Sequence, residues 1–117
     1  MLAHNASRVD GRGLEYRNPA TGGATFPTFA CWIQMLDAHQ QTTEHRHTSN
    51  QLYYAVEGSG VCEVEGEKLV WEAGDFFVVP NWSWHRHKNT SAAPAVLFST
   101  TDRPLHEAIG VYREQSR

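Results

Sequence analysis

Residues 51–71 read QLYYAVEGSGVCEVEGEKLVW, and this stretch establishes the class of structure. Runs of aromatic and β-branched residues alternate in it with two turn sequences, Glu57-Gly-Ser-Gly60 and Glu65-Gly-Glu67. Such a pattern predicts consecutive antiparallel hairpins, with strands over 51–57, 60–65 and 68–71.

Similar runs of aromatic and β-branched residues occur on both sides of these hairpins. They predict further strands over residues 28–36, 75–80 and 95–101, and the sequence predicts one short C-terminal helix over 104–110. Many short strands without helical crossovers favour an all-β sandwich or barrel. The polar, glycine-rich residues 1–25 predict an extended N-terminal arm, which leaves 26–117 as one small domain in a chain of 117 residues.

Composition excludes several classes of function. A net charge of −3 and only two lysines do not provide the basic face that non-specific nucleic-acid binding needs. No apolar run approaches the roughly 20 residues that cross a bilayer, and the N-terminus lacks the pattern of a secretory signal. We therefore expect a cytoplasmic protein that binds neither nucleic acid nor membrane, with Cys31 and Cys62 as reduced thiols.

Four of the seven histidines form two close pairs, His45 with His47 and His85 with His87. On an extended backbone, residues i and i+2 point to the same side, so both rings of a pair can reach one point. Gln51 falls on the side of the first pair if the strand is regular. Three neutral imidazoles at one point would suit Zn, Cu, Fe or Ni. A surface pair or a hydrogen-bonded polar site would explain His-x-His on its own without a metal.

Two segments resemble the sequence motifs of the cupin family. Residues 45–58 carry His45, His47, Gln51 and Gly58 at the spacing of the first cupin motif, and residues 74–89 resemble the second motif around His85. Cupins are small jelly-roll β-barrels, and by this resemblance His45, His47 and His85 would hold one divalent metal ion. Gln51 stands where cupins usually carry a glutamate, so it would be either a fourth ligand or a hydrogen-bond partner of a ligand.

A longer resemblance covers residues 14–114. Four stretches together resemble the C-terminal half of gentisate and 1-hydroxy-2-naphthoate 1,2-dioxygenases: Tyr16–Gly22, His45–Thr48, Pro80–His87 and Leu97–Pro104. Those enzymes are iron(II) bicupins that open the ring of hydroxy-aromatic acids with dioxygen. The resemblance therefore favours Fe(II) as the metal, with Ni, Zn, Mn or Cu as alternatives. It also implies a hydroxy-aromatic acid and dioxygen as the small-molecule partners.

Residues close to the ligand motifs are candidates for the surroundings of the metal. His87 shares a side with His85 and is the candidate acid/base. The candidates for substrate contact are Tyr53, Trp82, Trp84 and His39. The tryptophans could stack on an aromatic substrate, although packing or an interface would explain them too, and core packing would explain Tyr53. Arg46 and Arg86 lie between ligand positions, so strand alternation points them away from the metal.

Three departures from those dioxygenases bear on function. The chain has the length of one cupin half and resembles the C-terminal one, whereas the catalytic iron of the bicupins usually lies in the N-terminal half. His39 stands where the first motif expects a glycine. Three histidines leave three positions on an iron ion, enough for a bidentate hydroxy-acid and dioxygen, and binding by Gln51 would leave only two.

These patterns support two classes of function. The first is a metal-dependent enzyme of aromatic compound degradation that resembles gentisate 1,2-dioxygenase, with an oxygen-independent isomerase or lyase as the enzymatic alternative. The second is a non-catalytic cupin that binds a metal or small ligand, or an accessory subunit. Because cupin barrels often dimerise, we expect a homodimer formed through the N-terminal arm and an exposed sheet.

Overall fold

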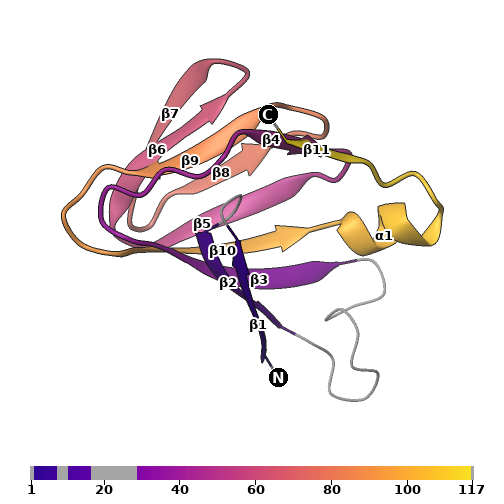
Figure 1. Cartoon of the computed structure of the whole chain (residues 1–117), viewed down its shortest axis with the longest axis horizontal. Helices are drawn as coiled ribbons and strands as arrows, with labels where there is room; N and C mark the ends of the chain where they lie inside the picture. Colours follow the sequence, from indigo (N-terminus) through magenta and orange to yellow (C-terminus); the bar gives the residue numbers. More distant parts are fainter. Residues whose placement is uncertain (1, 8–10, 17–28, 117) are drawn as a thin grey trace.

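The computed structural model describes residues 2–7, 11–16 and 29–116, and it consists of two antiparallel β-sheets in layers, followed by one short helix (Figure 1). The six-stranded sheet has the order β1-β2-β3-β10-β5-β8 and is made of Leu2–Ser7, Gly11–Tyr16, Ala30–Leu36, Ala95–Thr101, Gln51–Glu57 and Phe76–Val79. The five-stranded sheet has the order β11-β4-β9-β6-β7 and is made of Glu114–Ser116, His45–His47, His85–Asn89, Ser59–Val64 and Glu67–Glu72. The helix α1 spans Arg103–Ala108. The predicted all-β jelly-roll class with a short C-terminal helix is therefore confirmed.

The apolar strands lie where the sequence pattern predicts them. Strands β5 and β10 have the predicted bounds, 51–57 and 95–101, and the other predicted strands that fall within the described residues differ by one or two residues at their ends. The helix begins one residue earlier than predicted and ends at Ala108. Within the described part of the chain, no helix is long and apolar enough to cross a membrane.

Three strands carry no apolar pattern and were not predicted: β4, β9 and β11. Their sequences are HRH, HRHKN and EQS. In β9 the buried positions are His85, His87 and Asn89, so the inward side of this strand is polar. The other strands of the domain were predicted from runs of aromatic and β-branched residues, and a strand whose buried residues are polar lacks that signal.

Residues 2–7 and 11–16 of the predicted arm form a hairpin whose second strand, β2, pairs with β3. The hairpin thereby extends the six-stranded sheet at one edge (Figure 1). The boundary predicted between residues 25 and 26 lies outside the described residues, so the division into arm and domain stays a prediction.

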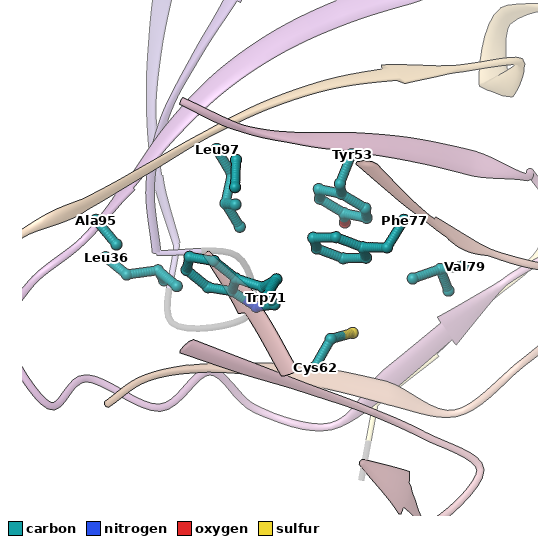
Figure 2. Close-up of a cluster of buried hydrophobic side chains, with 9 residues drawn as sticks. Leu36, Tyr53, Cys62, Trp71, Phe77, Val79, Ala95 and Leu97 are labelled. Atoms are coloured by element: carbon teal, nitrogen blue, oxygen red, sulfur yellow. The ribbon is translucent and has the colours of Figure 1, made fainter. Parts of the chain in front are cut away.

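The hydrophobic core fills one part of the space between the sheets (Figure 2). Its buried side chains come from both layers and are Leu36, Tyr53, Ala55, Cys62, Trp71, Phe77, Val79, Ala95 and Leu97. Strict alternation of inward and outward residues along β10 supplies Ala95 and Leu97. The rings of Tyr53 and Phe77 are stacked, with centroids 4.9 Å apart.

Gly60 on β6 leaves room for a backbone carbonyl of β9 and for the Trp71 ring of β7. A Cβ at this position would collide with the carbonyl oxygen of Lys88 and would lie 2.5 Å from the Trp71 ring. Strand β6 lies between β7 and β9, so neither neighbour can move away without loss of sheet pairing. The glycine is therefore required by packing and not by an unusual backbone angle.

Candidate metal centre

Three histidines from two neighbouring strands come together on the buried side of the five-stranded sheet. His45 and His47 lie on β4, His85 is the first residue of β9, and His45 pairs directly with His85 across the two strands. All three side chains are buried. One potential ligand atom from each ring lies within 4.8 Å of the others, a spacing that one metal ion can bridge.

Each ring is oriented by a carbonyl oxygen of the backbone two residues away. The Nδ1 atoms of His45, His47 and His85 lie 3.1, 2.9 and 2.9 Å from the carbonyl oxygens of Thr43, Ser49 and Ser83, respectively. A carbonyl only accepts a hydrogen bond, so each Nδ1 carries the proton. The unprotonated atom of each ring is therefore Nε2, and this tautomer is typical of histidines that bind a metal.

The environment of His85 favours the neutral ring. Burial, together with the nearby His45, His87 and His47 rings, lowers the pKa of His85 to about 2. Its Nε2 atom is buried and has no hydrogen-bond partner among the described residues. A buried acceptor of this kind is costly unless something binds it, and a divalent cation would satisfy it. The donor set therefore fits a metal ion.

Gln51 begins β5 on the same side as Tyr53 and is half-buried. Its amide nitrogen donates a hydrogen bond to the hydroxyl of Ser99 on β10, with a distance of 3.0 Å. This bond directs the amide nitrogen to Ser99, so Oε1 is the atom that Gln51 can offer to a metal or a substrate. Whether Gln51 is a ligand stays a prediction.

His87 lies next to the cluster, two residues after His85 on β9. It is fully buried, and its ring centroid is 5.9 Å from that of His85 and 4.7 Å from that of Tyr53. The backbone N–H of His87 donates to the hydroxyl of Thr42. The structure thus brings two sequence candidates, His87 and Tyr53, to the aromatic wall beside the three histidines, and their roles stay predictions.

The candidate residues Trp82 and Trp84 contact the other side of β4. The guanidinium of Arg46 lies 4.1 Å from the centroid of Trp82 and 4.6 Å from that of Trp84. Arg46 points away from the histidine side, as alternation predicts. These contacts give no support to stacking of the two rings on a substrate, which stays untested.

Arg86 likewise lies on the outer side of β9, where it forms an ion pair of 2.7 Å with Glu63.

His39 is exposed in the turn after β3, with a left-handed φ of 59°. This is the position where the first cupin motif expects a glycine, and the backbone keeps the conformation that favours glycine. The N–H of His39 donates to the carbonyl of Ser91, and Gln40 pairs with Asn89, at the end of β9 opposite His85. A direct contact of His39 with a substrate at the cluster therefore finds no support in the described residues.

Sequence reasoning missed the groups that orient the ligands. Three of them are main-chain carbonyls, of Thr43, Ser49 and Ser83, and a main-chain group leaves no mark on the sequence. The hydroxyl of Ser99 was missed as well, although its inward position on β10 follows from alternation.

Comparison with known proteins agrees with this architecture. The family model described as a cupin domain matches residues 32–101. The chain is 44% identical over 110 residues to 5-aminosalicylate 1,2-dioxygenase of a Comamonas species, which covers 94% of this chain and 29% of that protein. It is 39% identical to 1-hydroxy-2-naphthoate 1,2-dioxygenase of a Nocardioides species, over 91% of this chain and 28% of that protein.

A solved structure gives the same result. Salicylate 1,2-dioxygenase from Pseudaminobacter salicylatoxidans with gentisate bound superposes with a TM-score of 0.88 at 30% identity, over 97% of this chain and 31% of that one. The chain thus spans less than a third of the length of the relatives it matches. On the motifs, the two-sheet fold and these similarities, the chain belongs to the cupin family and is homologous to a portion of the gentisate, 1-hydroxy-2-naphthoate and salicylate 1,2-dioxygenases.

Proposed function

We propose that this protein is a cytoplasmic, metal-dependent cupin that acts as a ring-cleaving dioxygenase on a small hydroxy-aromatic acid. The observation that carries the proposal is the buried cluster of His45, His47 and His85 with all three Nδ1 atoms held by carbonyl oxygens. The relatives named above are 1,2-dioxygenases of such acids, and this supports the reaction class.

The three histidines would hold one metal ion through Nε2, with Fe(II) favoured and Ni, Zn, Mn or Cu as alternatives. When bound, Fe(II) supplies the redox chemistry with dioxygen and positions for the hydroxyl and carboxylate oxygens of the substrate. His87 would hold or move a proton at a ring nitrogen, because it is buried next to His85. The stacked rings of Tyr53 and Phe77 would exclude water from that side.

The charge of the donor set supports an anionic substrate. No carboxylate belongs to the cluster found among the described residues, and Gln51 offers a neutral amide oxygen. A divalent ion on neutral ligands keeps its full charge, so it attracts a carboxylate with an adjacent hydroxyl. In this proposal Gln51 hydrogen-bonds the bound substrate or completes the ligand set.

A non-catalytic cupin is the second candidate function. The observation in its favour is that the chain spans about 29% of its relatives, so the ring-opening activity of those proteins can depend on parts that this chain does not match. A metal- or ligand-binding module or an accessory subunit would use the same cluster. The enzymatic alternative, an oxygen-independent isomerase or lyase, would use it too.

One experiment separates these functions. The metal of the purified protein is identified, the protein is reconstituted with Fe(II) without oxygen, and oxygen uptake is followed with gentisate, salicylate and hydroxynaphthoate. The dioxygenase proposal expects uptake with at least one acid and none with a His85→Ala variant. A filled metal site with a tightly bound acid and no uptake across the panel would replace it with the binding function, and turnover without uptake would indicate the isomerase or lyase.

A homodimer is part of the proposal. The outer face of β5 and β8 exposes Leu52, Val56, Phe76 and Val78 at 40–68% of their surface. Leu52 pairs with Val78 across these strands, so the exposed groups form one continuous apolar patch of the kind that marks interfaces. Light scattering should give a dimer mass, and Phe76→Glu should shift it to the monomer, whereas Val70→Glu on the other sheet should not. A monomeric mass at micromolar concentration would disprove the dimer.

A further inference from the structure

The side of β4 opposite the histidines carries a cage around one cation. The guanidinium of Arg46 lies over the ring of Trp82 and over that of Trp84, at 4.1 and 4.6 Å from their centroids. Its Nε and Nη2 atoms both donate to Oε1 of Gln115 on β11, at 2.9 and 2.7 Å. The planar guanidinium is therefore held by two aromatic rings and by hydrogen bonds along one edge.

The two tryptophans of the cage lie in the segment whose backbone orients His85. Trp82 and Trp84 flank Ser83, whose carbonyl oxygen accepts the Nδ1–H of His85 at 2.9 Å. The N–H of Trp82 also donates to the carbonyl of His47, at 2.6 Å. Trp82 has a left-handed φ of 57°, a conformation that costs energy unless neighbouring contacts hold it. Arg46 provides such a contact on the rings at both ends of Ser83.

The strand β4 needs support from outside its own ladder. It has three residues and pairs with β9 only through His45 and His85. On its other side, β11 pairs with all three residues, and Arg46 pairs with Gln115. The side-chain bonds from Arg46 to Gln115 therefore join β4 to the strand that completes its pairing.

We propose that Arg46 is a positioning residue for the three-histidine centre. Through the rings of Trp82 and Trp84 it fixes the carbonyl of Ser83, and hence the ring of His85. Through Gln115 it fixes β4, and hence His45 and His47. The inference rests on the proposed metal site and goes beyond it, because it assigns control of ligand geometry to a cation on the opposite side of the strand. Partners that orient metal ligands commonly change metal affinity by about 10- to 100-fold.

The test compares Arg46→Met, Arg46→Lys and a matched control, Lys88→Met, in the full chain. Lys88 is an exposed cation on the outer side of β9. With Co(II) as the probe, Arg46→Met should weaken binding by about tenfold or more and alter the visible ligand-field spectrum of the bound ion. Arg46→Lys should fall in between, because an ammonium keeps the cation–π contact but not the planar two-nitrogen bond to Gln115. Lys88→Met should match the wild type.

A second readout needs no metal. In the metal-free wild type, the Nδ1–H of His85 should give a slowly exchanging proton signal by NMR, and Arg46→Met should lose that protection. Gln115→Ala, at an exposed position, provides a variant that should fold and should weaken Co(II) binding by a smaller factor than Arg46→Met.

The outcomes separate the two proposals. If the wild type binds Co(II) but Arg46→Met matches it in affinity, spectrum and proton exchange, the positioning role is wrong and the metal site stands. If the wild type binds no Co(II), the proposed metal function is wrong. If Arg46→Met does not fold, an unchanged affinity and spectrum in Gln115→Ala and Arg46→Lys would overturn the positioning role.

Discussion

His45 and His85 face each other across β4 and β9, with ring centroids 4.2 Å apart and with Nδ1–H groups bonded to different carbonyl oxygens. Both rings are buried, and each has an unprotonated Nε2 atom. Their close approach costs free energy unless a third group, such as a metal ion, binds both atoms.

Loss of His85 should abolish metal binding without unfolding the protein. His85→Ala removes one of three ligands, so we expect the metal content to fall from one ion per chain to near zero, as measured by elemental analysis. Chelation of the wild type should lower the free energy of unfolding by about 2.7 kcal/mol when the free metal had been at 100 times its Kd. In His85→Ala, chelation should have no effect. His106→Ala, outside the cluster, is the control and should keep its metal.

Gln51→Glu should raise the affinity for the metal and lower the affinity for the substrate. A carboxylate beside the cluster would raise the affinity for a divalent ion by about tenfold or more, because unlike charges attract strongly in a partly buried site. The same negative charge would weaken binding of an anionic organic acid, as a higher KM or Kd. Titration calorimetry with the metal and then with the acid measures both. Gln51→Leu loses the amide without gaining charge, and equal behaviour of the two variants would contradict the electrostatic explanation.

Gly60→Ala should destabilise the fold by about 3 kcal/mol. The added methyl group would overlap the carbonyl of Lys88 and the ring of Trp71, both of which are fixed by sheet pairing or core packing. Urea denaturation would measure the change. Val70→Ala, at a position 76% exposed, should stay within about 0.5 kcal/mol of the wild type. Equal stability of both variants would mean that the strands at Gly60 move apart easily.

Asp102 should make stability depend on acid pH. Burial alone would raise the pKa of Asp102, but hydrogen bonds from the backbone and side chain of Asn50 and the contact with His106 hold it below its ordinary value. The carboxylate therefore contributes stability above the pKa of the unfolded chain, and this contribution is lost as the pH falls through the lower pKa of the folded state. Asp102→Asn should cost about 1–2 kcal/mol at pH 7 and less near pH 3. A cost that does not change with pH would contradict this origin.

The two cysteines should differ in reactivity. Burial, with a smaller effect from Glu63, raises the pKa of the Cys62 thiol to about 12, so almost no thiolate exists at pH 8. Cys31 is only half-buried. A disulfide reagent at pH 8 should label at most one thiol per folded chain, and two after denaturation. Mass spectrometry should assign the first label to Cys31, and labelling of Cys62 in the folded protein would show that the core opens.

Much of the fold could be predicted from local pattern, and the cluster of three histidines from the resemblance to the cupin motifs. Strands β5 and β10 were predicted with their bounds because each is a run rich in aromatic, aliphatic or β-branched residues next to Gly, Asn or Pro. The two-residue period of an extended strand predicted that His45 and His47 share a side and that Arg46 points away. These properties depend on residues close together in the chain, so the sequence alone determines them.

The tertiary structure decided what joins distant segments. The pairing of β4 with β9 brings together His45 and His85, which are 40 positions apart in the sequence. Strand β9 has no apolar pattern from which it could be predicted. The tautomers depend on main-chain carbonyls such as that of Ser83, which every residue type possesses. The contacts of Arg46 require that β11 and the turn at Trp82 both lie next to β4. Such relationships arise when strands distant in the sequence pair within one sheet, because the order and register of that pairing set distances that no local pattern encodes.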